Sequence, residues 1–152
     1  MRHPLMVSGA GGSRASAQGF SLIEIMVAVV IVGILSSIAL PSYRDYVVRS
    51  ALSDAMANLA TKRVQNEQYF QDGHTYVGAP GCVSDSRSSP YFTFSCVTAT
   101  QTAYTVQAVG QGLAQGFTFS IDQSNTKATP AVPAGWLTST TCWTLRKGDA
   151  PC

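Results

Sequence analysis

Residues 20–40 form an apolar run whose only charged side chain is that of Glu24. At about 1.5 Å per residue, a helix of this length spans roughly 30 Å, the thickness of the hydrocarbon core of a bilayer. An acidic side chain near one end of such a helix costs up to about 2–3 kcal/mol on insertion. The run therefore predicts a membrane-spanning helix in which Glu24 needs a partner or a purpose.

Residues 1–19 are rich in Gly, Ala and Ser and contain Arg2 and Arg14 but no acidic residue. In an ordinary secretory signal the apolar region precedes the cleavage site, whereas here it follows Gly19. We therefore interpret residues 1–19 as a leader whose removal leaves the helix in the mature protein. The arginines before the run and the cysteines after it predict a cytoplasmic N-terminus and an oxidising environment for the rest.

Charge is scarce, and the formal net charge of the whole chain is +2. Arg2 and Arg14 belong to the predicted leader, so without it the 10 Lys and Arg fall to 8, against 8 Asp and Glu. The mature chain then has a formal side-chain charge of zero. Net charge alone gives no support to nucleic-acid binding.

Beyond Pro41, which we expect to kink or break the helix, the helical pattern continues to about residue 71. Apolar residues recur at steps of three or four, and Gly73 is a plausible stop. A helix over residues 20–71 would be roughly 75 Å long, more than a small domain can bury. The apolar stripe consists of Val48, Leu52, Met56, Leu59 and Phe70. Arg63 and Asn66 interrupt it towards its C-terminal end. Charged residues that lie mostly off the stripe are Asp54, Lys62, Arg63 and Glu67.

Alternating apolar residues after residue 73 predict four short antiparallel strands, over residues 89–97, 103–109, 116–122 and 142–146. The turn-rich residues 122–135 are interpreted as a connection. We expect the apolar face of this sheet to pack on the C-terminal half of the helix, which gives an α+β fold. The residues predicted to share faces are Phe92, Phe94 and Cys96; Tyr104, Val106 and Ala108; Phe117, Phe119 and Ile121; and Trp143 and Leu145.

The four cysteines include no CxxC pair, and the only histidines are His3 and His74, so no metal site and no cofactor are predicted. Two disulfides in an oxidising compartment fit better than four free thiols in a cytosolic protein. Of the three connectivities, pairing of neighbours closes short loops, and each bridge would contribute about 3 kcal/mol. The preferred pairs are Cys82–Cys96 and Cys142–Cys152.

The remaining sequence motifs give little evidence of a catalytic or ligand-binding site. The glycine-rich residues 110–116 join two predicted strands instead of opening a helix, and no nucleophile motif is present, so an enzyme is not expected. Four cations and two aromatic residues could form a DNA-binding patch, because clustered cations bind phosphates and aromatic rings stack on bases. The alternative is a set of scattered, solvated charges. The patch would consist of Arg87, Lys127, Arg146 and Lys147, with Tyr91 and Trp143.

The segment GFSLIEIMVAVVIVGILSSIALPSY, residues 19–43, resembles the N-terminal signature of type IV pilins and of type II secretion pseudopilins. The following helix, small sheet and C-terminal cysteine pair extend the resemblance to type IVa pilins over residues 20–152. The short head and its CW…C ending are most similar to PilE-type minor pilins. The resemblance implies a leader at 1–19, a membrane and assembly helix at 20–40, and a pilin head at 41–152.

The resemblance also implies roles for single residues. Prepilin peptidase would cut between Gly19 and Phe20 and methylate the new amine of Phe20. Glu24 would meet the N-terminal amine of a neighbouring subunit, and pairing of these two charges is more favourable where neither can be solvated. Gly33 and Pro41 match positions where family helices loosen or kink. Cys142–Cys152 would bound the variable C-terminal loop.

The implied function is that of a structural minor pilin, anchored in the inner membrane of a Gram-negative bacterium and then assembled into an extracellular type IV pilus. Its partners would be other pilin subunits, prepilin peptidase and the inner-membrane assembly platform. The alternatives are a pilus-borne DNA-uptake receptor, a major pilin and a pseudopilin. The pseudopilin is disfavoured because major pseudopilins usually bind calcium in an acidic C-terminal loop, and Asp149 is the only acid between Asp122 and Cys152.

Overall fold

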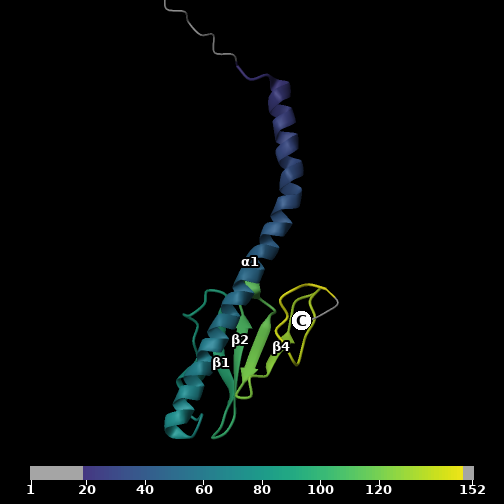
Figure 1. Cartoon of the computed structure of the whole chain (residues 1–152). Coiled ribbons are helices and arrows are strands. Elements are labelled where there is room, and N and C mark those ends of the chain that lie inside the picture. Colours follow the sequence, from purple (N-terminus) through teal and green to yellow (C-terminus); the bar gives the residue numbers. More distant parts are fainter. Residues whose placement is uncertain (1–18, 149–152) are drawn as a thin grey trace, which may run out of the picture. The chain divides into compact units, whose positions relative to one another are not determined.

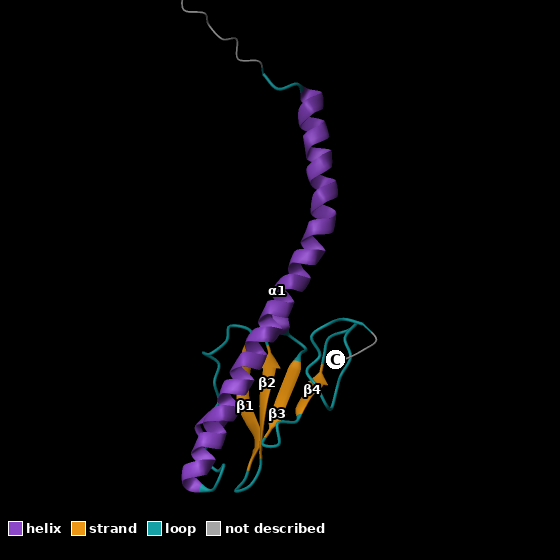
Figure 2. Cartoon of the chain, viewed as in Figure 1, coloured by secondary structure: helices purple, strands orange, loops and turns teal. Residues whose placement is uncertain are grey.

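The computed structural model describes residues 19–148 and divides into two compact units between Ala39 and Leu40. Helix α1 (Leu22–Gly73) contributes to both units, and the second unit adds a sheet (Figures 1 and 2). The strands are β1 (Phe92–Ala99), β2 (Tyr104–Gly110), β3 (Thr118–Asp122) and β4 (Lys127–Ala131), with short 3-10 helices η1 (Pro80–Cys82) and η2 (Gly112–Ala114). The predicted α+β fold with a long N-terminal helix and a four-stranded antiparallel sheet is confirmed.

Helix α1 is, among the described residues, the one helix long and apolar enough to cross a membrane. It continues through Pro41, although the proline ring removes one backbone donor, so the proline does not break it. It ends at Gly73, where the sequence predicts a stop. His74 then adopts a φ of 51° and donates its backbone N–H to the Phe70 carbonyl over 2.8 Å.

The sheet has the order β1-β2-β3-β4, and every neighbouring pair is antiparallel. Residues at alternate positions of the strands are buried and form one core with the C-terminal part of α1, which crosses one face of the sheet (Figure 2). The predicted inner face is confirmed for the first three strands. The largest buried side chains of this face are those of Phe92, Phe94, Tyr104, Val106, Phe119 and Ile121.

The fourth strand was predicted in the wrong place. The structure places β4 at Lys127–Ala131, inside the predicted connection, while residues 142–146 are not a strand. Pro130 lowers the apparent strand propensity, but a proline is tolerated on an edge strand such as β4. Trp143 still packs against the core, through a hydrogen bond from its indole Nε1 to the Ser120 carbonyl over 2.9 Å.

The buried face of α1 also differs from the predicted stripe. Lys62 and Asn66, predicted to lie off the stripe or to interrupt it, are buried on the face that meets the head. Lys62 pairs with Asp85, and Asn66 lies against Gly81 of η1. The head supplies hydrogen-bond partners for both side chains, since Asp85 accepts from the Lys62 ammonium and Cys82 Sγ accepts from Asn66 Nδ2 over 3.6 Å.

The predicted Cys82–Cys96 disulfide is confirmed and joins η1 to β1. The other predicted pair includes Cys152, which lies outside the described residues, as do residues 1–18 of the predicted leader. Both remain predictions.

Candidate functional site

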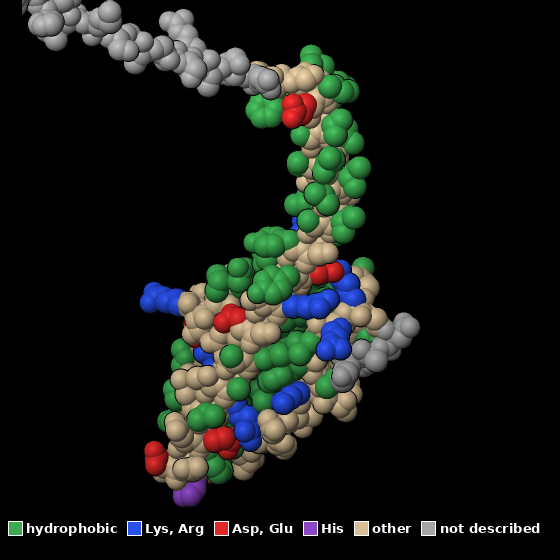
Figure 3. All heavy atoms as spheres, turned by 45° about the horizontal axis from the view of Figure 1, so that its top comes forward, with side chains coloured by type: hydrophobic (Ala, Val, Ile, Leu, Met, Phe, Trp, Pro, Cys, Tyr) green, Lys and Arg blue, Asp and Glu red, His purple; other side chains and the backbone are tan. Residues whose placement is uncertain are grey.

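The N-terminal part of α1 presents apolar side chains on all sides. Phe20 and Leu22 are each 78 % exposed, and no residue of 19–39 is buried within the described chain. Figure 3 shows hydrophobic side chains along the visible face of this part of the chain. Exposure of such a large apolar surface to water is unfavourable, so this part of the helix needs lipid or other helices around it.

Glu24 lies exposed in the first turn of α1, where its backbone N–H bonds to the Ser21 carbonyl over 3.0 Å. A carboxylate at this end of a helix interacts favourably with the helix dipole. Gly19 and Phe20 precede the helix, and Gly33 has open space around its Cα. These residues belong to the apolar residues 19–40, whose only charged side chain is that of Glu24.

On the head, one of the four predicted DNA-contacting cations contacts Trp143, and two more follow Trp143 by three and four residues in the chain. The ammonium of Lys127 lies 4.9 Å from the centroid of the Trp143 ring, a cation–π contact. The indole Nε1 is fixed by the Ser120 carbonyl, so the ring is held in place. Arg146 and Lys147 are exposed a few residues further along. We name Lys127, Trp143, Arg146 and Lys147 the Trp143 cluster. Several Lys and Arg side chains lie on the face of the head that Figure 3 shows.

Lys147 also contacts α1. Its Nζ lies 3.1 Å from Asp45 Oδ1, and both side chains are about half exposed. The two residues are 102 positions apart in the sequence, so this contact brings the C-terminal segment to the start of the head portion of α1. The Trp143 cluster thus extends from β4 to α1.

The structure does not bring Arg87 and Tyr91 to this cluster. Arg87 lies in the loop after η1. Asp85 of the same loop forms two backbone hydrogen bonds with Phe94 of β1. Tyr91 precedes β1 directly. Since β1 and β4 are the two edges of the sheet, Arg87 and Lys127 lie at opposite edges.

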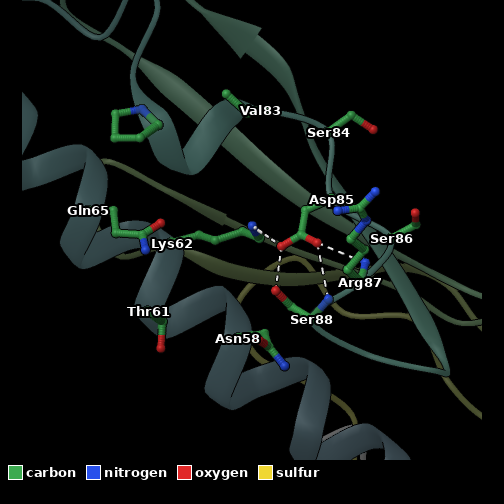
Figure 4. A pocket seen from close by; sticks show the side chains of 11 residues that line it. Asn58, Thr61, Lys62, Gln65, Val83, Ser84, Asp85, Ser86, Arg87 and Ser88 are labelled. Atoms are coloured by element: carbon green, nitrogen blue, oxygen red, sulfur yellow. Dashed lines mark hydrogen bonds and ion pairs between the residues drawn. The ribbon is translucent and has the colours of Figure 1, made fainter.

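Sequence reasoning missed a cavity of about 570 Å³ between α1 and the loop after η1 (Figure 4). Its floor is the ion pair of Lys62 Nζ and Asp85 Oδ2, 2.8 Å apart. The hydrogen bond from Lys62, helped by those from Ser88 and the backbone of Arg87 and Ser88, holds the pKa of the Asp85 carboxyl well below its usual range. One signal was present in the sequence, because Lys62 follows Leu59 by three residues, in phase with the apolar stripe.

A second polar contact, at the half-buried Glu67, joins the C-terminal part of α1 to two buried tyrosines. Glu67 of α1 accepts hydrogen bonds from the hydroxyls of Tyr76, over 3.1 Å, and Tyr104, over 2.9 Å. Burial first, and then the bond to Glu67, raise the pKa of both tyrosines. Within residues 19–148 no group of three or more His, Cys, Asp or Glu side chains is placed to hold a metal ion.

Two protein-family models match the chain. Residues 14–40 match the prokaryotic N-terminal methylation motif, and residues 41–120 match the family described as type IV minor pilin ComP, DNA uptake sequence receptor. The second match covers Arg87 and ends before the Trp143 cluster.

Several curated relatives match part of the chain. A probable minor fimbrial protein of Dichelobacter nodosus is 42 % identical over 71 residues, which cover 47 % of this chain and 45 % of the relative. The fimbrial protein EcpC of Eikenella corrodens is 44 % identical over 36 % of each chain. A type IV major fimbrial protein FimA of D. nodosus is 43 % identical over 37 % of this chain and 36 % of its own length. The chain therefore spans less than half the length of these relatives.

Proposed function

Because the chain belongs to the family of type IV minor pilins described as ComP, DNA uptake sequence receptor, we propose that it is a minor pilin, a structural subunit of a type IV pilus. The observation that carries this proposal is the joint match of the methylation motif and the minor-pilin head, on a chain whose first helical part is apolar on all sides. That helix would anchor the subunit in the inner membrane first. In the filament, neighbouring helices would take the place of lipid.

The proposed route begins with prepilin peptidase, which would cut after Gly19 and methylate the new amine of Phe20. The N-terminus would face the cytoplasm and the head the periplasm until the assembly platform extracts the subunit into the extracellular pilus of a Gram-negative bacterium. Gly33 and Pro41 would let the helix loosen during this transfer, since one lacks a side chain and the other lacks a backbone donor.

Glu24 would be the residue that registers one subunit against the next. It lies one helical turn from Phe20, where its carboxylate can pair with the amine of a neighbouring subunit in an apolar environment. An unpaired charge in such an environment is strongly unfavourable, so correct register is favoured over displaced ones. Repetition of a head-to-tail contact without closure produces a filament.

The test is the Glu24→Ala variant, with Asp72→Asn as a control that removes an exposed carboxylate from the other end of α1. We expect both variants to insert into the membrane and to lose the leader. We expect the amount of Glu24→Ala in sheared pili to fall at least about tenfold, and Asp72→Asn to remain at wild-type levels. Normal incorporation of Glu24→Ala would contradict the role assigned to this residue.

A second function, binding of DNA by the head, is supported by the description of the matched family and by the Trp143 cluster. Lys127 contacts Trp143, and the exposed Arg146 and Lys147 follow Trp143 by three and four residues. Exposed cations bind phosphates with release of counterions. Lys127 covers one face of the Trp143 ring, so we assign this ring to holding Lys127 in place.

This second function is tested by gel-shift titration of the full-length mature chain, in a nonionic detergent, with duplex DNA at several salt concentrations. We expect the Lys127→Gln/Arg146→Gln double variant to lose about tenfold in affinity and to reduce the salt slope by about two. The control is Arg87→Gln, at the opposite edge of the sheet, for which we expect little change. Equal losses would contradict the assignment to the Trp143 cluster, and no salt-dependent binding by the wild type would overturn the DNA-binding function while leaving the pilin function intact.

A further inference from the structure

We propose that Asp45 weakens DNA binding by this head, because it holds Lys147 in an intramolecular ion pair that a DNA phosphate must displace. This inference rests on the proposed DNA-binding function and adds a residue that lowers the affinity of the same site. In this view the Asp45 carboxylate occupies the place that a phosphate oxygen takes in the complex.

The geometry of the pair suits exchange. Lys147 Nζ lies 3.1 Å from Asp45 Oδ1, within contact distance, while the side chains of Lys147 and Asp45 are 53 % and 46 % exposed. Water and an incoming anion can therefore reach both groups. An exposed ion pair of this kind is weak, and the lysine ammonium is a compact charge on a flexible stem that can turn to another acceptor.

The other ion pair of the head provides a contrast. Lys62 and Asp85 are 2.8 Å apart, with side chains only 9 % and 22 % exposed. Asp85 also accepts three hydrogen bonds from Arg87 and Ser88, which hold it in place. Asp45 has no such additional bonds among the described residues, so its pairing with Lys147 is free to exchange.

The consequence for binding is electrostatic. The Trp143 cluster contributes the cations Lys127, Arg146 and Lys147, and Asp45 cancels one of these charges. Affinity that depends on phosphate contacts is independent of base sequence. The pair would therefore reduce binding to DNA of any sequence and leave discrimination to contacts with the bases.

The decisive variant is Asp45→Asn, which keeps the size of the side chain and removes its charge. We expect the full-length mature chain in detergent to bind duplex DNA about two- to fivefold more tightly, whatever the base sequence. The matched control is Asp72→Asn, which changes the net charge equally. It lies 27 residues further along α1, about 40 Å away along the helix and several Debye lengths at physiological salt.

A double-mutant cycle shows whether the gain passes through Lys147. We expect Asp45→Asn to have no effect on affinity in a Lys147→Gln background. A gain that persists there would show general repulsion of DNA by Asp45 and would overturn the inference, as would an equal gain in Asp72→Asn.

Two outcomes separate this inference from the function on which it rests. If the wild type binds DNA and Asp45→Asn binds no more tightly, the inference alone is overturned. If neither protein binds DNA, the DNA-binding function is overturned and the inference with it. Circular dichroism of each variant establishes that the comparison is between folded proteins.

Discussion

Lys62 of α1 and Asp85 of the loop after η1 form an ion pair of 2.8 Å over the aromatic ring of Phe94 in β1. The Lys62 ammonium lies 5.4 Å from the centroid of that ring. Helix, loop and sheet therefore meet at one buried lysine. The loop needs this contact because it contains many serines and little apolar surface to hold it on the helix.

Asp85→Asn should lower the free energy of unfolding at pH 7 by about 3 kcal/mol, because it leaves the Lys62 charge largely buried without a partner. The pKa of the Asp85 carboxyl is lower in the folded than in the unfolded state, mainly through Lys62. Such a group stabilises the fold above its unfolded pKa, near 4, and this contribution is lost as the pH falls further. Urea unfolding between pH 7 and pH 2 should show a shallower acid dependence for the variant, and an unchanged dependence would contradict this assignment. Asp72→Asn serves as the control.

Gly81→Ala should destabilise the head by about 1–3 kcal/mol, as overpacking of a well-packed site does. A Cβ at residue 81 would clash with the Lys62 carbonyl oxygen and the Asn66 side chain of α1. Gly73→Ala is the matched control, because a Cβ there meets only the methyl group of Thr75 at an ordinary 3.8 Å. Thermal unfolding of the two variants should differ clearly, and equal melting temperatures would show that η1 can move away from α1 at little cost.

Tyr104→Phe should cost about 1.5–3 kcal/mol, since Glu67 loses a hydrogen bond of 2.9 Å from a fully buried hydroxyl. Burial and the bond to Glu67 raise the pKa of Tyr104 above its unfolded value near 10. The wild type should therefore lose stability as the pH rises above 10, and the variant should lose less. Tyr69→Phe removes an exposed hydroxyl that bonds to the Val77 carbonyl, and we expect it to change the unfolding free energy by less than about 0.5 kcal/mol.

Thr129→Val should loosen the segment that carries the Trp143 cluster. The buried hydroxyl of Thr129 donates to the Cys142 carbonyl and accepts from the Thr144 N–H, both over 2.9 Å. Valine has the same shape but makes neither hydrogen bond, at a cost of about 1–3 kcal/mol. We expect faster amide exchange in residues 142–148 and weaker DNA binding. Wild-type exchange rates in this segment would show that Thr129 is not what holds it.

The first three strands follow from their sequence because each strand has one face on the core and one facing water, and this alternation is visible in the residues themselves. The helix follows equally from its apolar spacing and from Gly73. β4 does not, because it contains Pro130 and its one buried residue is the polar Thr129. Thr129 is buried there by hydrogen bonds to a segment more than ten residues away.

The candidate site also has features that follow from the sequence and features that depend on the tertiary structure. The apolar run, its single Glu24 and the glycine before Phe20 are local features, so the sequence by itself determined the anchor and the family resemblance. Which cations share a surface was decided by the order of the strands, which places Lys127 and Arg87 at opposite edges. The ion pairs Lys147–Asp45 and Lys62–Asp85 were likewise decided by the tertiary structure. The partners are 102 and 23 residues apart in the sequence, respectively, so no local sequence pattern connects them. Ion pairs form between groups that are close in space.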